Sequence, residues 1–357
     1  MLYIVYTTGQ CNLQCTYCGG SFPKHVVPWR VKYPLKSLVK FIYEDPEAII
    51  AFYGGEPLIN QKFIRKVMDS IDCAKLAIQT NATLIHRLDE KYWRRFDAVL
   101  LSIDGVKDVT DYYRGKGVYD AVIRAARWLR RIGFEGDLLA RMTVSEESDI
   151  YRDVMHLLSL GIFDHVHWQL DVIWSNRWRN FDYWLHSSYM PGITRLVKHW
   201  ISEIENGKVL GIVPFKAITY AIITGSPLEK PPCGAGSSAY AILTDGRILA
   251  CPIAVYESWA YAGHLLKDTP KTLKKYSLGP PCTECQYLNY CGGRCLYAHM
   301  ERLWGEYGFR KVCNATKHLI DLLKGSCGRV SRMLKSKIIF LEDIKYPLFN
   351  NTVEIIP

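Results

Sequence analysis

Short apolar runs alternate with amphipathic segments over residues 1–175, and this alternation constrains the fold of the chain more than any other feature. Helix-like segments, such as residues 60–71 and 119–133, separate the apolar runs. Strands that alternate with helices form parallel sheets with right-handed crossovers. The sequence therefore predicts an α/β fold, built as a full or partial (βα) barrel or as an open doubly wound sheet. The six expected strands lie at residues 2–9, 48–55, 76–82, 98–105, 138–144 and 165–174.

Polar motifs follow several of these expected strands. The motifs are "TGQCNLQC", "YGGEP", "QTNA" and "SIDG", at the ends of the first four runs. Ligands of parallel α/β folds bind at the C-terminal ends of the strands. We therefore expect the four motifs to contribute to one shared pocket.

The chain contains 12 cysteines, which serve either as disulfides in an oxidising compartment or as metal ligands in a reducing one. We recognise neither an export signal nor a run of roughly 18 apolar residues that could span a bilayer. We therefore expect a soluble, cytoplasmic protein whose cysteines bind metal.

The net charge of +10 favours acidic partners such as a nucleic acid or an acidic peptide, or reflects a basic surface without a specific partner.

Three cysteines, Cys11, Cys15 and Cys18, lie in the loop after the first expected strand. Iron–sulfur clusters and structural zinc sites usually take four protein ligands, so three ligands leave one metal position open for an exchangeable group. Alternatively, a remote cysteine completes an inert cluster or zinc site, and Cys73 is the nearby candidate.

This CxxxCxxC loop after the first strand of a (βα)₆ partial barrel resembles the radical S-adenosylmethionine (radical SAM) superfamily. The resemblance implies that Cys11, Cys15 and Cys18 hold a [4Fe–4S] cluster and that S-adenosylmethionine completes its coordination. It also implies reductive cleavage of S-adenosylmethionine to a 5′-deoxyadenosyl radical, which abstracts a hydrogen atom from the substrate. The protein then supplies geometry and excludes water.

The same resemblance implies a set of S-adenosylmethionine contacts. Tyr17 packs near the adenine, and Glu56 of the GGEP motif accepts a hydrogen bond from the cationic amino group. Gly54 and Gly55 let the backbone approach the ligand closely. The remaining expected contacts, at or beyond strand ends, are Ser102, Arg114, Arg141 and Gln169.

Seven cysteines between residues 231 and 320 follow a second pattern, C–x12–G–x4–C, then C–x2–C–x5–C–x3–C, then C. This pattern resembles the SPASM extension, which implies two auxiliary [4Fe–4S] clusters and three clusters in the whole chain. The resemblance assigns Cys282, Cys285, Cys291 and Cys313 to auxiliary cluster II, and it assigns Cys233, Cys251 and Cys295 to auxiliary cluster I.

The segment before Cys233, "TGSPLEKPP", contains no cysteine or histidine. Auxiliary cluster I would therefore carry an open iron or a non-cysteine ligand, and an open iron could bind the substrate directly. The alternative for the C-x2-C pairs is zinc, although seven cysteines match neither one four-cysteine site nor two. Cys73 and Cys327 are left over and are expected to be free thiols.

The resemblance divides the chain into a radical SAM partial barrel at residues 1–175, a helical bridge at 176–230, a SPASM domain at 231–320 and a C-terminal extension at 321–357. The extension is basic and then strand-like, in "KIIFLEDI" and "NTVEIIP". The chain also resembles an archaeal subgroup of radical SAM/SPASM enzymes described only as peptide-modifying.

Radical SAM/SPASM enzymes mostly modify peptides or proteins, so we expect a peptide or protein substrate, of the ribosomally made kind, and an electron donor such as ferredoxin or flavodoxin. Sulfatase maturases carry an acid directly after the Cys251 equivalent, where this chain has Pro252, which disfavours the formylglycine reaction. A peptide would dock by strand addition to an exposed sheet edge, in the barrel, or on the aromatic bridge at Trp174, Trp178 and Trp184, although such aromatic residues are commonly core.

Three other functions stay open. The chain could act on a small molecule, or it could be a non-catalytic iron–sulfur electron carrier or cluster chaperone. Modification of RNA is a further alternative because of the basic surface, but no RNA-binding module is recognised. Formation of 5′-deoxyadenosine separates the enzymes from the carrier, and salt-dependent binding of tRNA would support the RNA function.

Overall fold

The computed structural model describes residues 1–346 except 73, 174–177, 229 and 303. The chain divides into two compact units. The first unit comprises Met1–Ile103, Thr110–Leu139 and Cys233–Ser277. The second unit comprises Asp104–Val109, Ala140–Pro232 and Leu278–Pro357.

A mixed sheet forms the core of the first unit. Its parallel strands are β1 (Leu2–Thr8), β2 (Ile49–Gly54), β3 (Lys75–Thr80) and β4 (Ala98–Ser102), and β7 (Ala239–Ile242) pairs in parallel with the other side of β1. Strands β8 (Arg247–Leu249) and β9 (Tyr261–His264) continue the sheet in antiparallel pairing, which gives the order β4-β3-β2-β1-β7-β8-β9. All seven residues of β1 are buried, as expected for a strand in the middle of a covered sheet.

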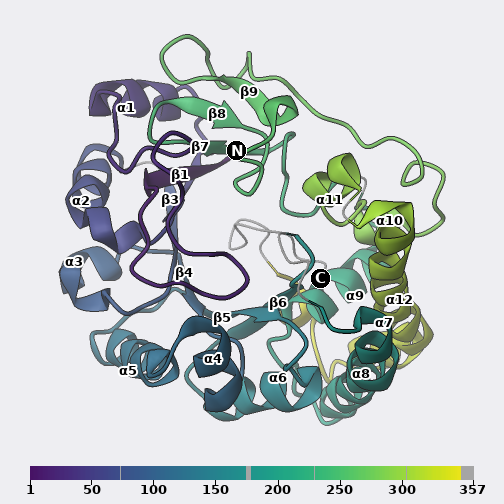
Figure 1. The fold of residues 1–357 in the computed structure, drawn as a ribbon. Coiled ribbons are helices and arrows are strands. Elements are labelled where there is room, and N and C mark those ends of the chain that lie inside the picture. The colour runs from purple at the N-terminus through teal and green to yellow at the C-terminus, as the bar shows by residue number, and fades with distance from the viewer. Residues whose placement is uncertain (73, 174–177, 229, 303, 347–357) are drawn as a thin grey trace. The chain divides into compact units, whose positions relative to one another are not determined.

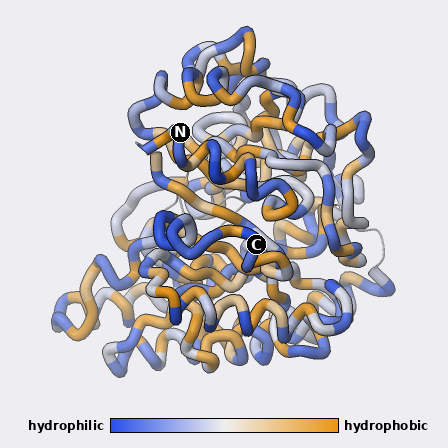
Figure 2. Tube along the Cα trace, turned by 90° about the vertical axis from the view of Figure 1, so that its left-hand side faces the viewer, coloured by the Kyte–Doolittle hydropathy of each residue, from blue (hydrophilic) through white to orange (hydrophobic). Residues whose placement is uncertain are grey.

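Amphipathic helices cover this sheet. In Figure 1, α1 (Leu35–Tyr43), α2 (Gln61–Ser70) and α3 (Glu90–Trp93) lie on the outer side of the strands. Helix α2 buries Phe63, Ile64, Val67 and Met68, and polar residues occupy its other face. Helix α5 (Val118–Arg131) has the same character, and the 3₁₀ segments η1 (Pro57–Asn60) and η2 (Ile85–Arg87) connect strands to helices. Figure 2 shows hydrophobic and hydrophilic residues alternating along the helices.

Strand β5 (Asp137–Val144) begins in the first unit, where Asp137 N donates to Asp97 O at 2.9 Å, and it continues into the second unit. Helix α4 (Lys107–Arg114) also runs from one unit to the other. Beside β5, the second unit contains β6 (His165–Leu170) and helix α6 (Ile150–Ser159).

Helices make up most of the second unit. Helix α7 (Phe181–Trp184) continues through the π-helical turn η3 (Leu185–Tyr189) into α8 (Met190–Glu205), and α9 (Val213–Thr224) follows. The cysteine-rich region contains the short helices α10 (Leu288–Cys291) and α11 (Leu296–Glu301) and the long helix α12 (Gly305–Lys335), which packs against α8 and α9 (Figure 1). Among the helices that the structure describes, none has the length and apolar character that crossing a membrane requires.

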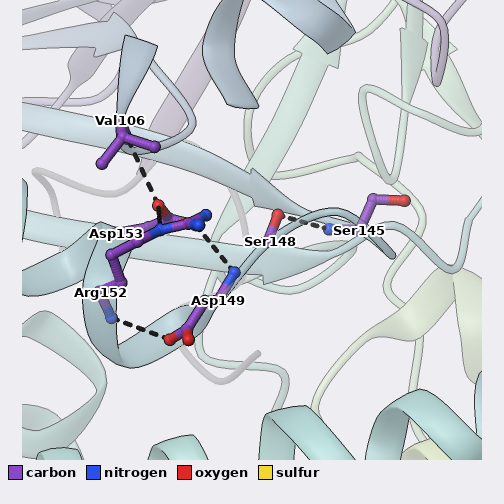
Figure 3. A network of polar contacts seen from close by, with 6 residues as sticks. All are labelled: Val106, Ser145, Ser148, Asp149, Arg152 and Asp153. Carbon is purple, nitrogen blue, oxygen red and sulfur yellow. Dashed lines mark hydrogen bonds and ion pairs between the residues drawn. The ribbon is translucent and has the colours of Figure 1, made fainter. Parts of the chain in front are cut away.

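A buried carboxylate fixes the start of α6 (Figure 3). Asp153 is fully buried and accepts from Arg152 Nε at 2.9 Å, from Asp149 N at 2.9 Å and from Val106 N at 3.4 Å. Val106 belongs to the loop that follows the "SIDG" strand, so Asp153 connects this loop to the helix. Gly105 is required here because it has a φ of +123° and its added Cβ would lie 2.3 Å from Cβ of Asp153.

The predicted fold class is confirmed: it is α/β, with the alternating parallel strands and helices typical of a partial barrel and with a cysteine-rich C-terminal region. All six predicted strands are present as β1 to β6. The strand-like prediction for residues 337–344 is wrong, because Leu341–Ile344 form helix α13, whose start is stabilised by Phe340 N donating to Asp343 Oδ2 at 2.7 Å. The prediction for residues 351–357, like those for Trp174 and Cys73, lies outside the described residues. The functional division of the chain into four segments stays a prediction.

Candidate functional site

The three-cysteine loop directly follows β1 in the first unit. Cys15 is buried, Cys11 is half-buried and Cys18 is exposed, and none of the three forms a disulfide. A tight turn forms where Cys15 O accepts from Cys18 N at 3.1 Å and from Gly19 N at 2.9 Å. Leu13 N donates to Cys11 Sγ at 3.5 Å, so the backbone of the loop already contacts one sulfur.

The end of β2 supports this loop through its backbone. Gly55 N donates to Thr8 O at 3.0 Å, and Glu56 N donates to Gln10 O at 2.7 Å. A Cβ added to Gly54 would lie 2.3 Å from Thr8 O, and one added to Gly55 would lie 2.1 Å from Gln10 O. The two glycines are therefore required by the close approach of the cysteine loop itself. Their predicted approach to a ligand stays a prediction.

Glu56 is buried below the loop and accepts three hydrogen bonds. Its Oε1 accepts from Leu58 N at 3.0 Å and from Thr80 Oγ1 at 2.7 Å, and its Oε2 accepts from Asn81 N at 2.8 Å. Burial raises the pKa of Glu56 to about 7, although the three hydrogen bonds lower it. Glu56 thus joins the end of β2 to the end of β3. A carboxylate has about four acceptor positions, so the three bonds leave one of them unused.

Asn81, which follows β3, is a site residue that the sequence analysis did not single out. Its Nδ2 donates to Asn12 Oδ1 at 3.0 Å and lies 3.9 Å from Cys11 Sγ. Asn12 in turn donates from Nδ2 to Thr83 Oγ1 at 2.8 Å. The "QTNA" motif at a strand end marked this segment as polar, but the motif alone gave Asn81 no contact with the cysteine loop.

Tyr17 and Arg114, two predicted cofactor contacts, lie together in the first unit. The Arg114 guanidinium is 5.4 Å from the centre of the Tyr17 ring, and that ring is 5.8 Å from the ring of Tyr113. Thr16 N donates to Tyr113 O at 2.9 Å, which attaches the cysteine loop to the end of α4. Arg114 is buried, and Ser102 is buried at the end of β4.

Arg141 and Gln169, the other two predicted contacts, lie together in the second unit. Arg141 Nη2 donates to Gln169 Oε1, and Arg141 Nη1 donates to Met142 O at 3.2 Å. A second polar pair lies beyond them at the strand ends, where Ser145 Oγ donates to Asp171 Oδ2 at 2.9 Å. The sequence analysis missed this second pair.

Four cysteines of the second unit surround one cavity of about 40 Å³: Cys282, Cys285, Cys291 and Cys313. Turn hydrogen bonds place them, from Cys285 N to Cys282 O at 3.1 Å and from Cys291 N to Tyr287 O at 3.0 Å. Burial, and to a smaller extent the neighbouring Cys313 and Cys291 thiols, raise the pKa of Cys282 to about 11. Such mutual effects arise because the sulfur atoms lie close together.

The remaining three predicted ligands belong to different units. Cys233 and Cys251 lie in the first unit and Cys295, which is buried at the start of α11, lies in the second. Tyr6 of β1 donates from its hydroxyl to Pro252 O at 2.5 Å, next to Cys251. The assignment of these three cysteines to one cluster stays a prediction.

The donor chemistry of the four-cysteine cavity fits an iron–sulfur cluster. Four free thiols line it, and thiolates are the ligands that such clusters take. Within the described residues, no three His, Cys, Asp or Glu side chains converge closely enough to hold a single metal ion. Cys11, Cys15 and Cys18 offer donors of the same kind, and their assignment to a cluster with one exchangeable position stays a prediction.

Comparisons with known proteins agree with this geometry. A family model described as the Radical SAM superfamily matches residues 5–158. The chain is 23% identical over 377 residues to a cysteine-type anaerobic sulfatase-maturating enzyme of Clostridium perfringens, with 89% of this chain and 98% of that protein covered.

Two solved structures share the fold. The structure of native anSMEcpe with AdoMet and the Cp18Cys peptide bound has a TM-score of 0.71 at 20% identity and covers 96% of this chain and 99% of that one. The structure of Streptococcus suis SuiB bound to its precursor peptide SuiA has a TM-score of 0.59 at 14% identity and covers 83% and 72%. Residues 5–158 therefore form a radical SAM domain, and over most of its length the chain is similar to enzymes that mature sulfatases.

Proposed function

We propose that this enzyme cleaves S-adenosylmethionine reductively and uses the resulting radical to modify a peptide or protein. The observation that carries the proposal is the three-cysteine loop after β1, which the Gly54–Gly55–Glu56 segment and Asn81 support from two strand ends. A [4Fe–4S] cluster bound by Cys11, Cys15 and Cys18 would supply the electron for the cleavage.

The protein's own residues would bind and orient the cofactor. Tyr17 offers a ring face for the adenine, and the neighbouring Arg114 supplies a buried positive charge for a carboxylate or ribose. Glu56 would accept from the amino group with its remaining acceptor position. Following the resemblance, we assign further cofactor contacts to Ser102, Arg141 and Gln169.

Two auxiliary clusters complete the proposal and bring the number of clusters to three. Cys282, Cys285, Cys291 and Cys313 would hold one, and Cys233, Cys251 and Cys295 would hold the other with one position open or filled by another ligand. Such clusters require an external reductant, and we propose a ferredoxin or flavodoxin as the electron donor.

A peptide substrate is supported by the fold, because both solved structures compared above contain a bound peptide. Formylglycine formation is disfavoured. The position after Cys251 is Pro252, which offers no acid, and its carbonyl is held by the Tyr6 hydroxyl. We therefore propose a different peptide modification from that of the sulfatase-maturating relative.

Strand addition at β9 is not available to the peptide. This strand ends the sheet of the first unit, but Ala262 O accepts from Lys274 N at 2.9 Å and Tyr261 O accepts from Tyr276 Oη at 2.8 Å. The chain thus covers this edge itself, as native sheets commonly do. In the second unit, the backbone N–H of Val166 at the start of β6 is likewise already used, because it donates to Gly211 O at 2.7 Å.

The aromatic bridge supplies the more suitable anchor. Trp184 is buried and therefore core, whereas Trp178 is half-buried and donates from Nε1 to Asp171 O at 2.8 Å, just after β6. The rings of Trp178 and Trp184 lie 4.7 Å apart. Trp178 thus connects an aromatic cluster to the C-terminal end of a strand, where ligands of this fold bind.

Anaerobic reconstitution with iron and sulfide, followed by dithionite and S-adenosylmethionine, tests the proposal. The wild type should form 5′-deoxyadenosine, and Cys15→Ala should form none. Cys327→Ala, which removes a cysteine outside all three ligand sets, should behave like the wild type and is the matched control. Absence of 5′-deoxyadenosine from an iron-loaded wild type would instead favour the electron carrier. A mass change in a peptide encoded by a short neighbouring reading frame would separate a peptide from a small-molecule substrate.

A further inference from the structure

Arg294 occupies an unusual position between Gly293 and Cys295. Its side chain is 5% exposed, and its backbone has a φ of +57°, in the left-handed region that favours glycine. Arg294 N donates to Cys291 O at 2.8 Å, which fixes the turn. A long cationic side chain is thus buried at a backbone position where glycine would cost less.

The buried side chain lies at the four-cysteine cavity. Arg294 lines this cavity together with Cys282, Cys285, Cys291 and Cys313. Its guanidinium stays protonated in proteins, so a permanent positive charge belongs to the wall that the four sulfur-bearing residues share. The described lining contains one other cationic side chain, Lys317, and no carboxylate.

Lys317 differs from Arg294 in its exposure to solvent. It is half-buried on α12, and its Nζ lies 5.5 Å from the centre of the Tyr287 ring, whose hydroxyl donates to Asp321 at 2.9 Å. Its partial exposure lets solvent screen its charge. Arg294 has no comparable exposure, so its charge acts through a medium of lower dielectric constant.

We infer that Arg294 sets the reduction potential of the cluster held by Cys282, Cys285, Cys291 and Cys313. The inference rests on the proposed function, because it requires a cluster in this cavity. Reduction adds one negative charge to a group that four thiolates already make anionic. A buried cation in the wall of the cavity stabilises the reduced form more than the oxidised form, and charge near a cluster is one of the factors that set its potential.

The test is a redox titration of the reconstituted full chain, followed by electron paramagnetic resonance (EPR). The signal that is lost in Cys282→Ser identifies the cluster of this cavity. At a fixed potential, Arg294→Gln should lower the ratio of reduced to oxidised cluster about tenfold, which corresponds to about 59 mV for one electron. Arg294→Lys keeps the charge and should stay close to the wild type. Lys317→Met should give a smaller shift, and Lys324→Met, exposed on the same helix and outside the cavity lining, should give none.

Each outcome bears on the inference. An unchanged ratio of reduced to oxidised cluster in Arg294→Gln would overturn the inference, because the charge would then have no effect. Equal decreases of this ratio in Arg294→Gln and Arg294→Lys would also overturn it, because they indicate packing and not charge. Loss of the cluster in Arg294→Gln alone would also overturn it, because that result assigns the charge to binding of the cluster and not to its potential. Equal iron content and identical spectra in the wild type and Cys282→Ser would instead refute the proposed cluster in this cavity, and the inference with it.

Discussion

The backbone N–H of Asn81 donates to Oε2 of Glu56 at 2.8 Å, while the side chain of Asn81 lies 3.9 Å from Sγ of Cys11. One residue after β3 therefore connects the buried carboxylate of the GGEP motif with the first cysteine of the loop. This relationship explains why the motif and the loop occur together: each depends on the same strand end.

Glu56 should make the stability of the apoprotein depend on pH. Its pKa is about 7 in the folded chain against an ordinary value of 4.5, so between these values the folded state binds more protons than the unfolded state. The contribution of Glu56 to the free energy of unfolding should therefore fall as the pH rises from 4.5 to about 7. Urea unfolding of the wild type and Glu56→Gln across this range measures it. A difference between the two proteins that does not vary with pH would contradict the assignment.

Gly55→Ala should disrupt the cysteine loop. The added Cβ would lie 2.1 Å from Gln10 O, a backbone atom that cannot move without displacing Cys11. The iron bound after reconstitution should fall below that of the wild type, and formation of 5′-deoxyadenosine should be lost. Gly328→Ala is the matched control, because no heavy atom lies within 4 Å of its added Cβ and alanine is favoured over glycine inside a helix. Full iron loading of Gly55→Ala would contradict the proposed close approach.

Asp153→Ala should destabilise the chain by about 3 kcal/mol, since it removes a fully buried carboxylate that accepts from two backbone amides and from Arg152. The free energy of unfolding in urea measures the loss. Glu205→Gln breaks the ion pair with Arg329, whose two side chains are 35% and 42% exposed, and should have a much smaller effect. Equal effects of the two substitutions would show that the hydrogen bonds of Asp153 in Figure 3 add little to the free energy of unfolding.

Tyr6→Phe should cost about 1–2 kcal/mol of stability, because it leaves the buried carbonyl of Pro252 without its donor. Tyr43→Phe removes a similar hydroxyl, bonded to Asp72 at 3.1 Å, from a side chain that is 50% exposed, and it should cost less. Thermal unfolding of the two variants compares them. If Tyr43→Phe were the more destabilising, the hydrogen bond from Tyr6 to Pro252 would contribute little to the stability of the chain.

The sequence predicted the six strands because buried parallel strands are nearly continuous apolar runs, as β1 and β4 are. The resemblance to the SPASM extension assigned Cys282, Cys285, Cys291 and Cys313 to a common site, and all four line one cavity. Contacts between distant segments could not be predicted in this way. Examples are the bond from Lys274 to Ala262 that covers β9, and the bonds from Thr80 and Asn81 to Glu56. Residues 337–344 contain β-branched residues typical of strands, but the Asp343 side chain favours a helix start instead.

The central claim is that the cluster of the Cys11, Cys15 and Cys18 loop has one coordination position that S-adenosylmethionine fills. EPR spectroscopy of the dithionite-reduced, fully loaded protein tests this most directly, with spectra recorded before and after S-adenosylmethionine is added. We predict that the nucleotide changes the signal of one cluster, and that this cluster is the one missing from Cys15→Ala. Spectra that stay identical after the addition, for every cluster in the chain, would contradict the claim.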